Sequence, residues 1–374
     1  RPQTAIVSLT VTEKGYCTDA ASGQLDLNNP LIQHDLAHPA TPKSAIGYIV
    51  EALRLRREEG LNAFTVMSCD NVRENGHVAK VAVLGLAQAR DPALAAWIEA
   101  HATFPCTMVD RIVPAATPET LQEIADQLGV YDPCAIACEP FRQWVIEDSF
   151  VNGRPEWDKV GAQFVEDVVP FEMMKLRMLN GSHSFLAYLG YLGGYETIAD
   201  TMTNPAYLKA AFALMMQEQA PTLSMPEGTD LQAYATLLIA RFSNPSLRHR
   251  TWQIAMDGSQ KLPQRLLDPI RLHLQNGSSW RHLALGVAGW MRYTQGSDEQ
   301  GQPIDVVDPL LAEIQQINQR YQGAERVAAL LAISGIFAHD LPDNGDFVNA
   351  VTLAYQQLCE RGARECVAAV SASL

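Results

Sequence analysis

The sequence contains no long apolar segment and little positive charge. No apolar run reaches the roughly 20 residues that a membrane-spanning helix needs, and the best candidate, Leu283–Met291, contains two glycines. Basic residues number 28 against 42 acidic ones, which leaves a net charge of −14. These features argue against a membrane partner and against nucleic acid, whose phosphates repel an acidic chain. A small anionic substrate remains compatible, because one basic pocket can offset a distant acidic surface.

Disulfide and metal frameworks are lacking as well. The seven cysteines are odd in number and scattered through apolar segments, unlike those of a secreted disulfide-rich protein. Cys134 and Cys138 stand four apart, but no second Cys or His pair has zinc-site spacing, so we predict no metal. The N-terminus has no basic-then-apolar leader. We therefore expect a cytoplasmic protein.

The glycine-rich GxGxxG motif, which opens many dinucleotide-binding folds, occurs nowhere in the chain. The sequence begins instead with Arg1-Pro2-Gln3, directly before the β-branched run of residues 4–12. Such a run is typical of a buried strand. Because a chain rarely begins with a central strand, we expect further sequence before residue 1.

The length of 374 residues predicts two or three domains. Residues 1–168 alternate between strand and helix patterns. The expected strands are 4–12, 64–68 and 106–109, and the expected helices are 44–59, 78–89 and one that opens at Thr117. This alternation is typical of parallel βαβ units. Segments 141–146 and 161–165 are strand-like without helices between them, which suggests an antiparallel extension.

Residues 169–374 have a helical period almost throughout. The expected helices are 171–190, 205–219, 230–242, 247–274, 281–293, 308–320, 324–334 and 346–371. The predicted fold class is therefore a parallel α/β domain, residues 1–168, followed by an all-α domain, residues 169–374.

One predicted helix concentrates polar side chains. Offsets of five and eight residues place Asn180 and His183 at about 140° and 80° from Lys175 around an α-helix. One helix can thus aim an ammonium, an amide and an imidazole into one cleft, and Glu172 is placed to exchange protons with Lys175. Burial in an apolar cleft lowers the pKa of a lysine toward neutrality, which suits a general base for an alcohol. The alternative is a solvated helix whose Asn and His cap neighbouring structure.

Polar residues also follow the predicted strands. Residues 68–76 (SCDNVRENG) come directly after a strand, and Asp110 ends the next one. The carboxyl ends of parallel strands form the edge where ligands bind, so we expect both at one site, although an ordinary Asp-Asn turn would also explain the first. Residues 10–16 (TVTEKGY) form a third strand end. Residues 257–261 (DGSQK) place Lys261 in the helical domain, where the alternative is a solvated charge.

These segments resemble the polyol-specific long-chain dehydrogenases/reductases, the mannitol dehydrogenase family. The matching motifs are TVTEKGY (10–16), SCDNVRENG (68–76), TMVDRIVP (107–114), EPFRQWVIED (139–148), KLRMLNGSH (175–183) and DGSQK (257–261). They span nearly the whole chain, and the lysine motif is highly specific. The resemblance implies a partial Rossmann-type sheet without its first βαβ fingerprint, a mostly helical substrate domain, NAD as cofactor with NADP not excluded, and no metal.

The resemblance also implies residue roles. Lys175 would be the general acid/base, linked to solvent by Glu172. Asn71 and Asn180 would donate hydrogen bonds to the developing alkoxide. His183, Asp110 and Lys261 would contact the substrate. Thr12, Glu13 and Asn71 would lie near the nicotinamide side of the cofactor.

One departure from the family pattern concerns the substrate. Mannitol-type members carry an Arg eight residues before the second Lys, where this chain has Gln253. That stretch and MLNGSHSFLAYLGYLGGY (178–195) are most similar to the fructuronate reductase, or mannonate oxidoreductase, branch. A hexuronate carries a carboxylate, and Arg248 or Arg250 is a candidate to bind it, although surface charges on a helix are an equal alternative.

The leading hypothesis is an NAD-dependent enzyme that interconverts D-fructuronate and D-mannonate. A mannitol or arabinitol 2-dehydrogenase is the alternative within the class, and Gln253 counts against it. A non-catalytic sugar-acid binding remnant, without the dinucleotide fingerprint, is the alternative from another class. The expected partner is a small sugar acid or polyol, and the expected state is a monomer or weak homodimer.

Overall fold

The structure, a computed structural model, describes residues 1–19 and 21–372. It divides into an α/β unit, residues 1–111 with 141–172, and a helical unit, residues 112–140 with 173–374. The predicted order of an α/β part and a helical part is confirmed. This division differs from the predicted boundary after residue 168 in two respects, because the segment 112–140 groups with the helices and residues 169–172 group with the α/β unit. A buried ion pair between Glu139 and Arg241 fixes that segment to α10 (Leu231–Phe242).

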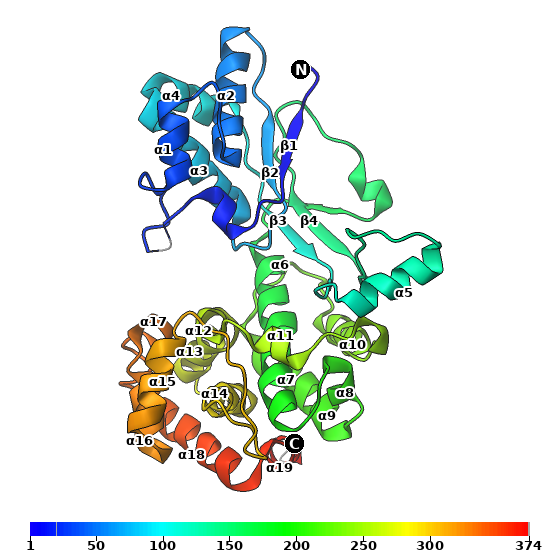
Figure 1. Ribbon diagram of the computed structural model, residues 1–374, viewed down its shortest axis with the longest axis vertical. Helices are drawn as coiled ribbons and strands as arrows, with labels where there is room; N and C mark the ends of the chain where they lie inside the picture. Colours follow the sequence, from blue (N-terminus) through cyan, green and yellow to red (C-terminus); the bar gives the residue numbers. More distant parts are fainter. Residues whose placement is uncertain (20, 373–374) are drawn as a thin grey trace. The chain divides into compact units, whose positions relative to one another are not determined.

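The α/β unit is organised around a parallel strand pair. β1 (Ile6–Leu9) and β2 (Thr65–Ser68) align Ile6 with Thr65 and Leu9 with Ser68. Helices α1 to α4 lie together on one side of this pair (Figure 1). The other elements of the unit are η1 (Glu13–Tyr16), α1 (Pro30–Ala37), α2 (Ala45–Glu58), α3 (Asn75–Arg90), α4 (Pro92–His101), β3 (Thr107–Asp110), β4 (Gln143–Glu147), η2 (Trp157–Val160) and β5 (Gln163–Val165).

The third strand pairs differently from the expectation. The segment before β3 joins the β1–β2 pair through an isolated parallel bridge between Thr65 and Thr103. The ladder of β3 itself is antiparallel to β4, which in turn pairs in parallel with β5. The Thr107 hydroxyl donates to the Ser68 carbonyl at 2.6 Å, so β3 starts where β2 ends. Asp110 ends β3, three residues beyond Thr107.

The helical unit begins on a helix that continues from the α/β unit. α6 (Val169–Met174), the π-helical η3 (Lys175–Asn180) and α7 (Gly181–Leu192) follow one another without a break. The other elements are α5 (Pro118–Leu128), α8 (Ile198–Met202), α9 (Pro205–Ala213), η4 (Leu214–Gln219), η5 (Ala220–Thr222), α10 (Leu231–Phe242), η6 (Pro245–Leu247), α11 (Thr251–Ala255), α12 (Gly258–Leu262), η7 (Pro263–Leu267), α13 (Asp268–Asn276), α14 (Arg281–Tyr293), α15 (Leu311–Arg320), α16 (Gly323–Leu331), α17 (Ser334–Phe337), α18 (Gly345–Arg361) and α19 (Ala363–Ala372).

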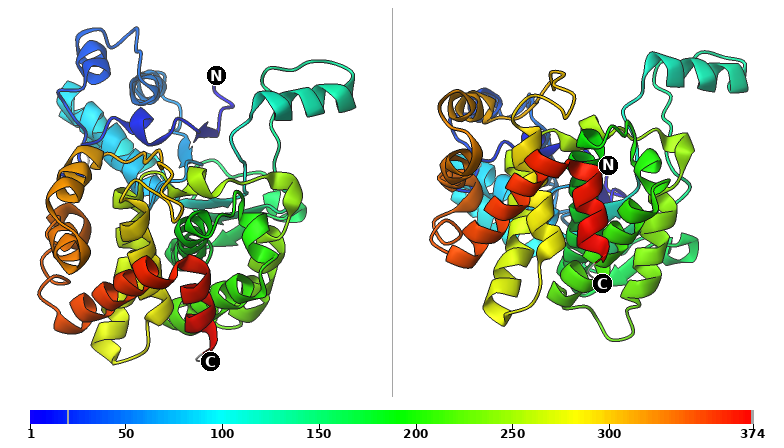
Figure 2. Two further views of the ribbon diagram at one scale, coloured as in Figure 1. Left: turned by 60° about the horizontal axis from the view of Figure 1, so that its bottom comes forward. Right: turned by 90° about the horizontal axis from the view of Figure 1, so that it is seen from below.

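Helices α7 and α14 form the core of the helical unit. Nearly every residue of both is buried, as expected of a helix with neighbours on all sides. Phe185, Tyr188 and Trp290 are among the largest fully buried side chains. Helix α18 packs against α14, and the two helices lie side by side in the right view of Figure 2. Among the described residues, no helix has the length and apolar character to span a membrane.

The helix expected over 247–274 is divided in the structure. Arg248 and Asp257 adopt left-handed backbone conformations, with φ of 46° and 57°, and these residues separate η6, α11 and α12. Helices α1 and α4 were not predicted, although each begins with a clear signal. Asn29 and Asp91 cap them, and each cap is followed by proline at the first turn.

Candidate active site

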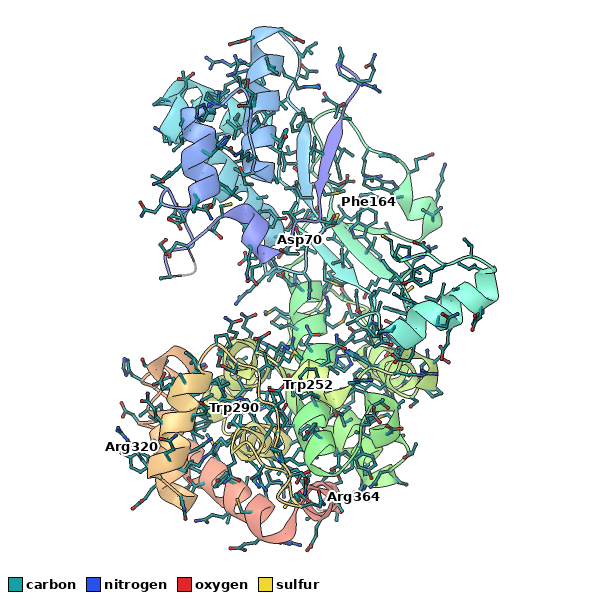
Figure 3. All side chains as sticks on the ribbon, in the orientation of Figure 1. Asp70, Phe164, Trp252, Trp290, Arg320 and Arg364 are labelled. Carbon is teal, nitrogen blue, oxygen red and sulfur yellow. The ribbon has the colours of Figure 1, made fainter. Side chains whose placement is uncertain are left out.

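Asp70 organises the carboxyl edge of β1 and β2. Its Oδ1 accepts from the Thr12 amide at 2.9 Å, and its Oδ2 accepts from the Val11 amide at 3.1 Å and from the Tyr16 hydroxyl at 2.5 Å. These bonds hold Thr12 at φ 63°, a conformation that a β-branched residue rarely adopts. Thr12 and Glu13, two of the predicted cofactor-binding residues, are exposed. Asp70, which binds the Thr12 amide, is labelled in Figure 3.

Asn75 fixes the loop that contains Asn71. Its side-chain amide donates to the carbonyls of Ser68, Asp70 and Thr107, and its Oδ1 accepts from the Thr107 amide at 2.9 Å. Asn71 therefore projects from a loop that is tied to the ends of both strands.

Glu172 is held against the same loop. Its Oε1 accepts from the Glu74 amide at 2.8 Å, and Glu74 itself has a left-handed backbone with φ of 48°. The structure thus brings the predicted proton-linking carboxylate to the loop of Asn71, 98 residues away in sequence. Asp110, at the end of β3, is 4% exposed.

The predicted lysine helix contains a π-helical turn, η3, that starts at Lys175 and ends at Asn180. A π-helix has more residues per turn than an α-helix, so positions five apart come closer in angle than the roughly 140° expected for an α-helix. Lys175 and His183 are 8% and 5% exposed, which excludes the solvated helix as an explanation for them. Single π-helical turns occur frequently at functional sites.

The π-helical turn depends on close packing at Gly181. A Cβ there would lie 2.5 Å from Gln219 Nε2 and 3.1 Å from the Arg265 carbonyl oxygen. Gln219 Nε2 also donates to that carbonyl at 2.9 Å, so η3, η4 and η7 meet around this glycine. The absence of a side chain at Gly181 therefore lets three π-helical turns approach one another.

We expect Gly181→Ala to lower the free energy of unfolding by about 1–3 kcal/mol, because the added methyl group displaces the Gln219 amide. Urea titration would measure the change. Gly335→Ala is the matched control, since a Cβ at Gly335 meets nothing within 4 Å. The control should stay within about 0.5 kcal/mol of the parent. Equal stability of the two variants would contradict the packing argument.

His183 lies against a second imidazole. The rings of His183 and His249 are perpendicular with centroids 5.3 Å apart, and Phe242 covers His183 at 4.6 Å. Burial holds the pKa of His183 well below its ordinary value, and the positive charges of Arg265 and Arg241 act in the same direction. Burial also lowers the pKa of His249 to about 4. Both rings are therefore neutral at pH 7.

Lys261 is half-buried in the same unit. Its Nζ donates to the Ile254 carbonyl at 3.1 Å. Burial, and next the charge of Arg265, lower the pKa of Lys261 to about 8, while Asp257 and Asp308 partly oppose that shift. The solvated-charge alternative for Lys261 does not fit this environment.

The two predicted carboxylate-binding arginines lie elsewhere. Arg248 has 62% of its side chain exposed and pairs with Glu123 at 2.9 Å, and Arg250 has 54% exposed and lies 4.0 Å from Glu196. The left-handed turn at Arg248 directs the intervening His249 toward His183, and both arginines are at the surface. Gln253 is half-buried in α11. The structure therefore places His183 next to His249, and not next to Arg248 or Arg250.

Comparison with known proteins identifies the class. The chain matches the mannitol dehydrogenase Rossmann domain over residues 1–159 and the mannitol dehydrogenase C-terminal domain over residues 167–359. The fold and these two matches define a Rossmann-type oxidoreductase with a mostly helical C-terminal part, as predicted. The chain belongs to the mannitol dehydrogenase family.

Individual relatives agree with this assignment. The chain is 90% identical to D-mannonate oxidoreductase of Escherichia coli (strain K12) over 370 residues, 99% of this chain and 76% of the relative. It is 40% identical to mannitol dehydrogenase DSF1 of Saccharomyces cerevisiae, over 96% of this chain and 72% of the relative. Among solved structures, mannitol 2-dehydrogenase of Pseudomonas fluorescens in a ternary complex with NAD and D-mannitol is 40% identical, with a TM-score of 0.85, over 100% of this chain and 76% of that one.

Proposed function

We propose that this protein interconverts D-fructuronate and D-mannonate with NAD as cofactor. The observation that carries the proposal is the 90% identity with D-mannonate oxidoreductase over 99% of the chain. The buried Lys175, on a π-helical turn that also contains Asn180, supports a reaction in which an alcohol and a ketone exchange a proton.

The α/β unit has groups that fit the cofactor. The carboxyl edge of a parallel strand pair is where dinucleotides bind, and this edge presents the exposed Thr12 and Glu13. Their hydroxyl and carboxylate are suited to the hydrogen-bonding groups of a nicotinamide riboside, and Asp70 fixes the main chain that carries them. NAD supplies or accepts the hydride when bound.

The helical unit has groups that fit the proton transfer. During reduction Lys175 donates a proton to the carbonyl oxygen of the substrate, and during oxidation it takes the hydroxyl proton back. Asn180 donates a hydrogen bond to the oxygen as negative charge develops there. His183 and Lys261 position substrate hydroxyls. We keep the predicted roles of three further residues: hydrogen bonding to the alkoxide for Asn71, substrate binding for Asp110 and proton exchange with solvent for Glu172. The cytoplasmic location and the monomer or weak homodimer stay predictions.

Substrate preference tests the proposal. We expect kcat/KM for NADH consumption to be about 10- to 100-fold higher with D-fructuronate than with D-fructose. A buried cation stabilises a bound carboxylate more than it stabilises a bound hydroxymethyl group. NADPH serves as the cofactor control. A preference for D-fructose would assign the protein to the polyol dehydrogenases, and no turnover with either substrate would favour the non-catalytic binding protein.

A further inference from the structure

Two cations lie one turn apart on a continuous helical stretch of the helical unit. Lys261 is in α12 and Arg265 is in η7, and these elements continue into α13 without a break. Residues four apart share one helix face, so the ammonium and the guanidinium are on the same side. Lys261 is among the residues predicted from the sequence to contact the substrate, and Arg265 is not.

Neither cation has a carboxylate partner among residues 1–19 and 21–372. Arg265 Nη1 donates to the Ser184 hydroxyl at 3.2 Å and to the Asn180 carbonyl at 3.4 Å. Lys261 Nζ donates to the Ile254 carbonyl. All three acceptors are neutral. Arg248, by contrast, pairs with Glu123 at the surface, so it has less charge to offer to a ligand.

The absence of a paired carboxylate is costly for both groups, although Asp257 and Asp308 offset part of the cost at Lys261. Burial lowers the pKa of Arg265 to about 10, far from the ordinary value for a guanidinium, and Arg265 in turn lowers the pKa of Lys261. Half-buried like charges without an anion raise the free energy of the site unless a ligand compensates them.

We propose that Arg265, together with Lys261, binds the carboxylate of the sugar-acid substrate and thereby distinguishes it from a neutral polyol. This inference rests on the proposed function and adds the residue that selects the substrate class. Arg265 contacts the backbone of Asn180, the residue that ends the π-helical turn of Lys175. The carboxylate is thereby anchored to the same helix that supplies the general acid/base, and the fork of a guanidinium suits a carboxylate geometrically.

The kinetic test compares Arg265→Gln, Arg265→Lys and Arg320→Gln with the parent protein. We expect Arg265→Gln to raise the KM for D-fructuronate by about 10- to 100-fold, with kcat within about threefold, because a charge-assisted bond to the ground state is lost. The KM for D-fructose should change less than about threefold. Arg265→Lys should recover part of the D-fructuronate affinity. Arg320 is exposed, so Arg320→Gln controls for the loss of one charge.

A purely structural Arg265 gives a different pattern. If Arg265 only supports the Asn180 carbonyl, Arg265→Gln weakens D-fructuronate and D-fructose equally, and this result would overturn the proposal. A KM for D-fructuronate raised as much by Arg320→Gln as by Arg265→Gln would overturn it as well.

A binding experiment separates this proposal from the proposed function. The thermal unfolding midpoint is measured with D-mannonate and with the neutral D-mannitol at equal concentration. The carboxylate site is supported if D-mannonate raises the unfolding midpoint of the parent protein but not that of Arg265→Gln, while D-mannitol raises both. This result supports the site even if D-fructuronate is not turned over. Absence of protection by D-mannonate in the parent protein, or equal protection of parent and variant, overturns the carboxylate site.

Discussion

Replacing Lys175 with methionine is expected to lower kcat by about 10³-fold, while KM changes by less than about threefold. The side chain is 8% exposed and starts the π-helical turn, and methionine fills similar space without a titratable group. A positioned general acid/base contributes about 10²–10⁴-fold to a rate, and it acts mainly in the transition state. Steady-state kinetics of D-fructuronate reduction at saturating NADH measure both constants.

Lys209→Met is the matched control, because Lys209 is exposed on α9 of the same helical unit. It removes the same charge and should leave kcat within about twofold. Small primary amines added to a Lys175→Ala protein, whose shorter side chain leaves room for them, should restore part of the rate, since they supply the missing ammonium. A normal kcat for Lys175→Met would end the assignment of Lys175 as the general acid/base.

The parts of the fold that local pattern determines were predictable. The helix expected over 44–59 is observed as Ala45–Glu58, with Ser44 as its cap, because its apolar period and its cap agree. The π-helical turn at Lys175 was not predictable in this way. It depends on Gly181 packing against Gln219 and Arg265, which are 38 and 84 residues away in sequence, and periodicity reports no such contact.

The candidate site could likewise be predicted from the sequence only in part. The spacing of Lys175, Asn180 and His183 on one helix, and the polar residues after β2, were visible in the sequence. Arg265 was not, because a lone arginine in a helical pattern is indistinguishable from a surface charge until its neighbours are known. The contact between His249 and His183 was not predictable either. It depends on the left-handed backbone at Arg248, which interrupts the expected helix.

Replacing Arg241 with methionine is expected to lower the free energy of unfolding by about 3–5 kcal/mol, because it leaves the Glu139 carboxylate buried without its counter-ion. The two side chains are 3% and 2% exposed, and Arg241 Nη2 donates to Glu139 Oε1 at 2.6 Å while Nε donates to Oε2 at 3.0 Å. The same carboxylate accepts from the Ile112 amide at 2.7 Å. Loss of the pair therefore loosens the whole segment 112–140 from α10. Urea titration measures the change.

The double variant Glu139→Gln/Arg241→Met separates the charge from the packing. Glutamine keeps an oxygen that accepts from the Ile112 amide but carries no charge, so no uncompensated ion stays buried. We expect the double variant to be more stable than Arg241→Met alone by about 1–3 kcal/mol, a coupling typical of buried pairs. Arg320→Met, at an exposed position, should change the stability by less than about 0.5 kcal/mol. If the double variant is the less stable of the two, the cost in Arg241→Met comes from lost packing of the arginine stem against its neighbours, and not from the stranded carboxylate.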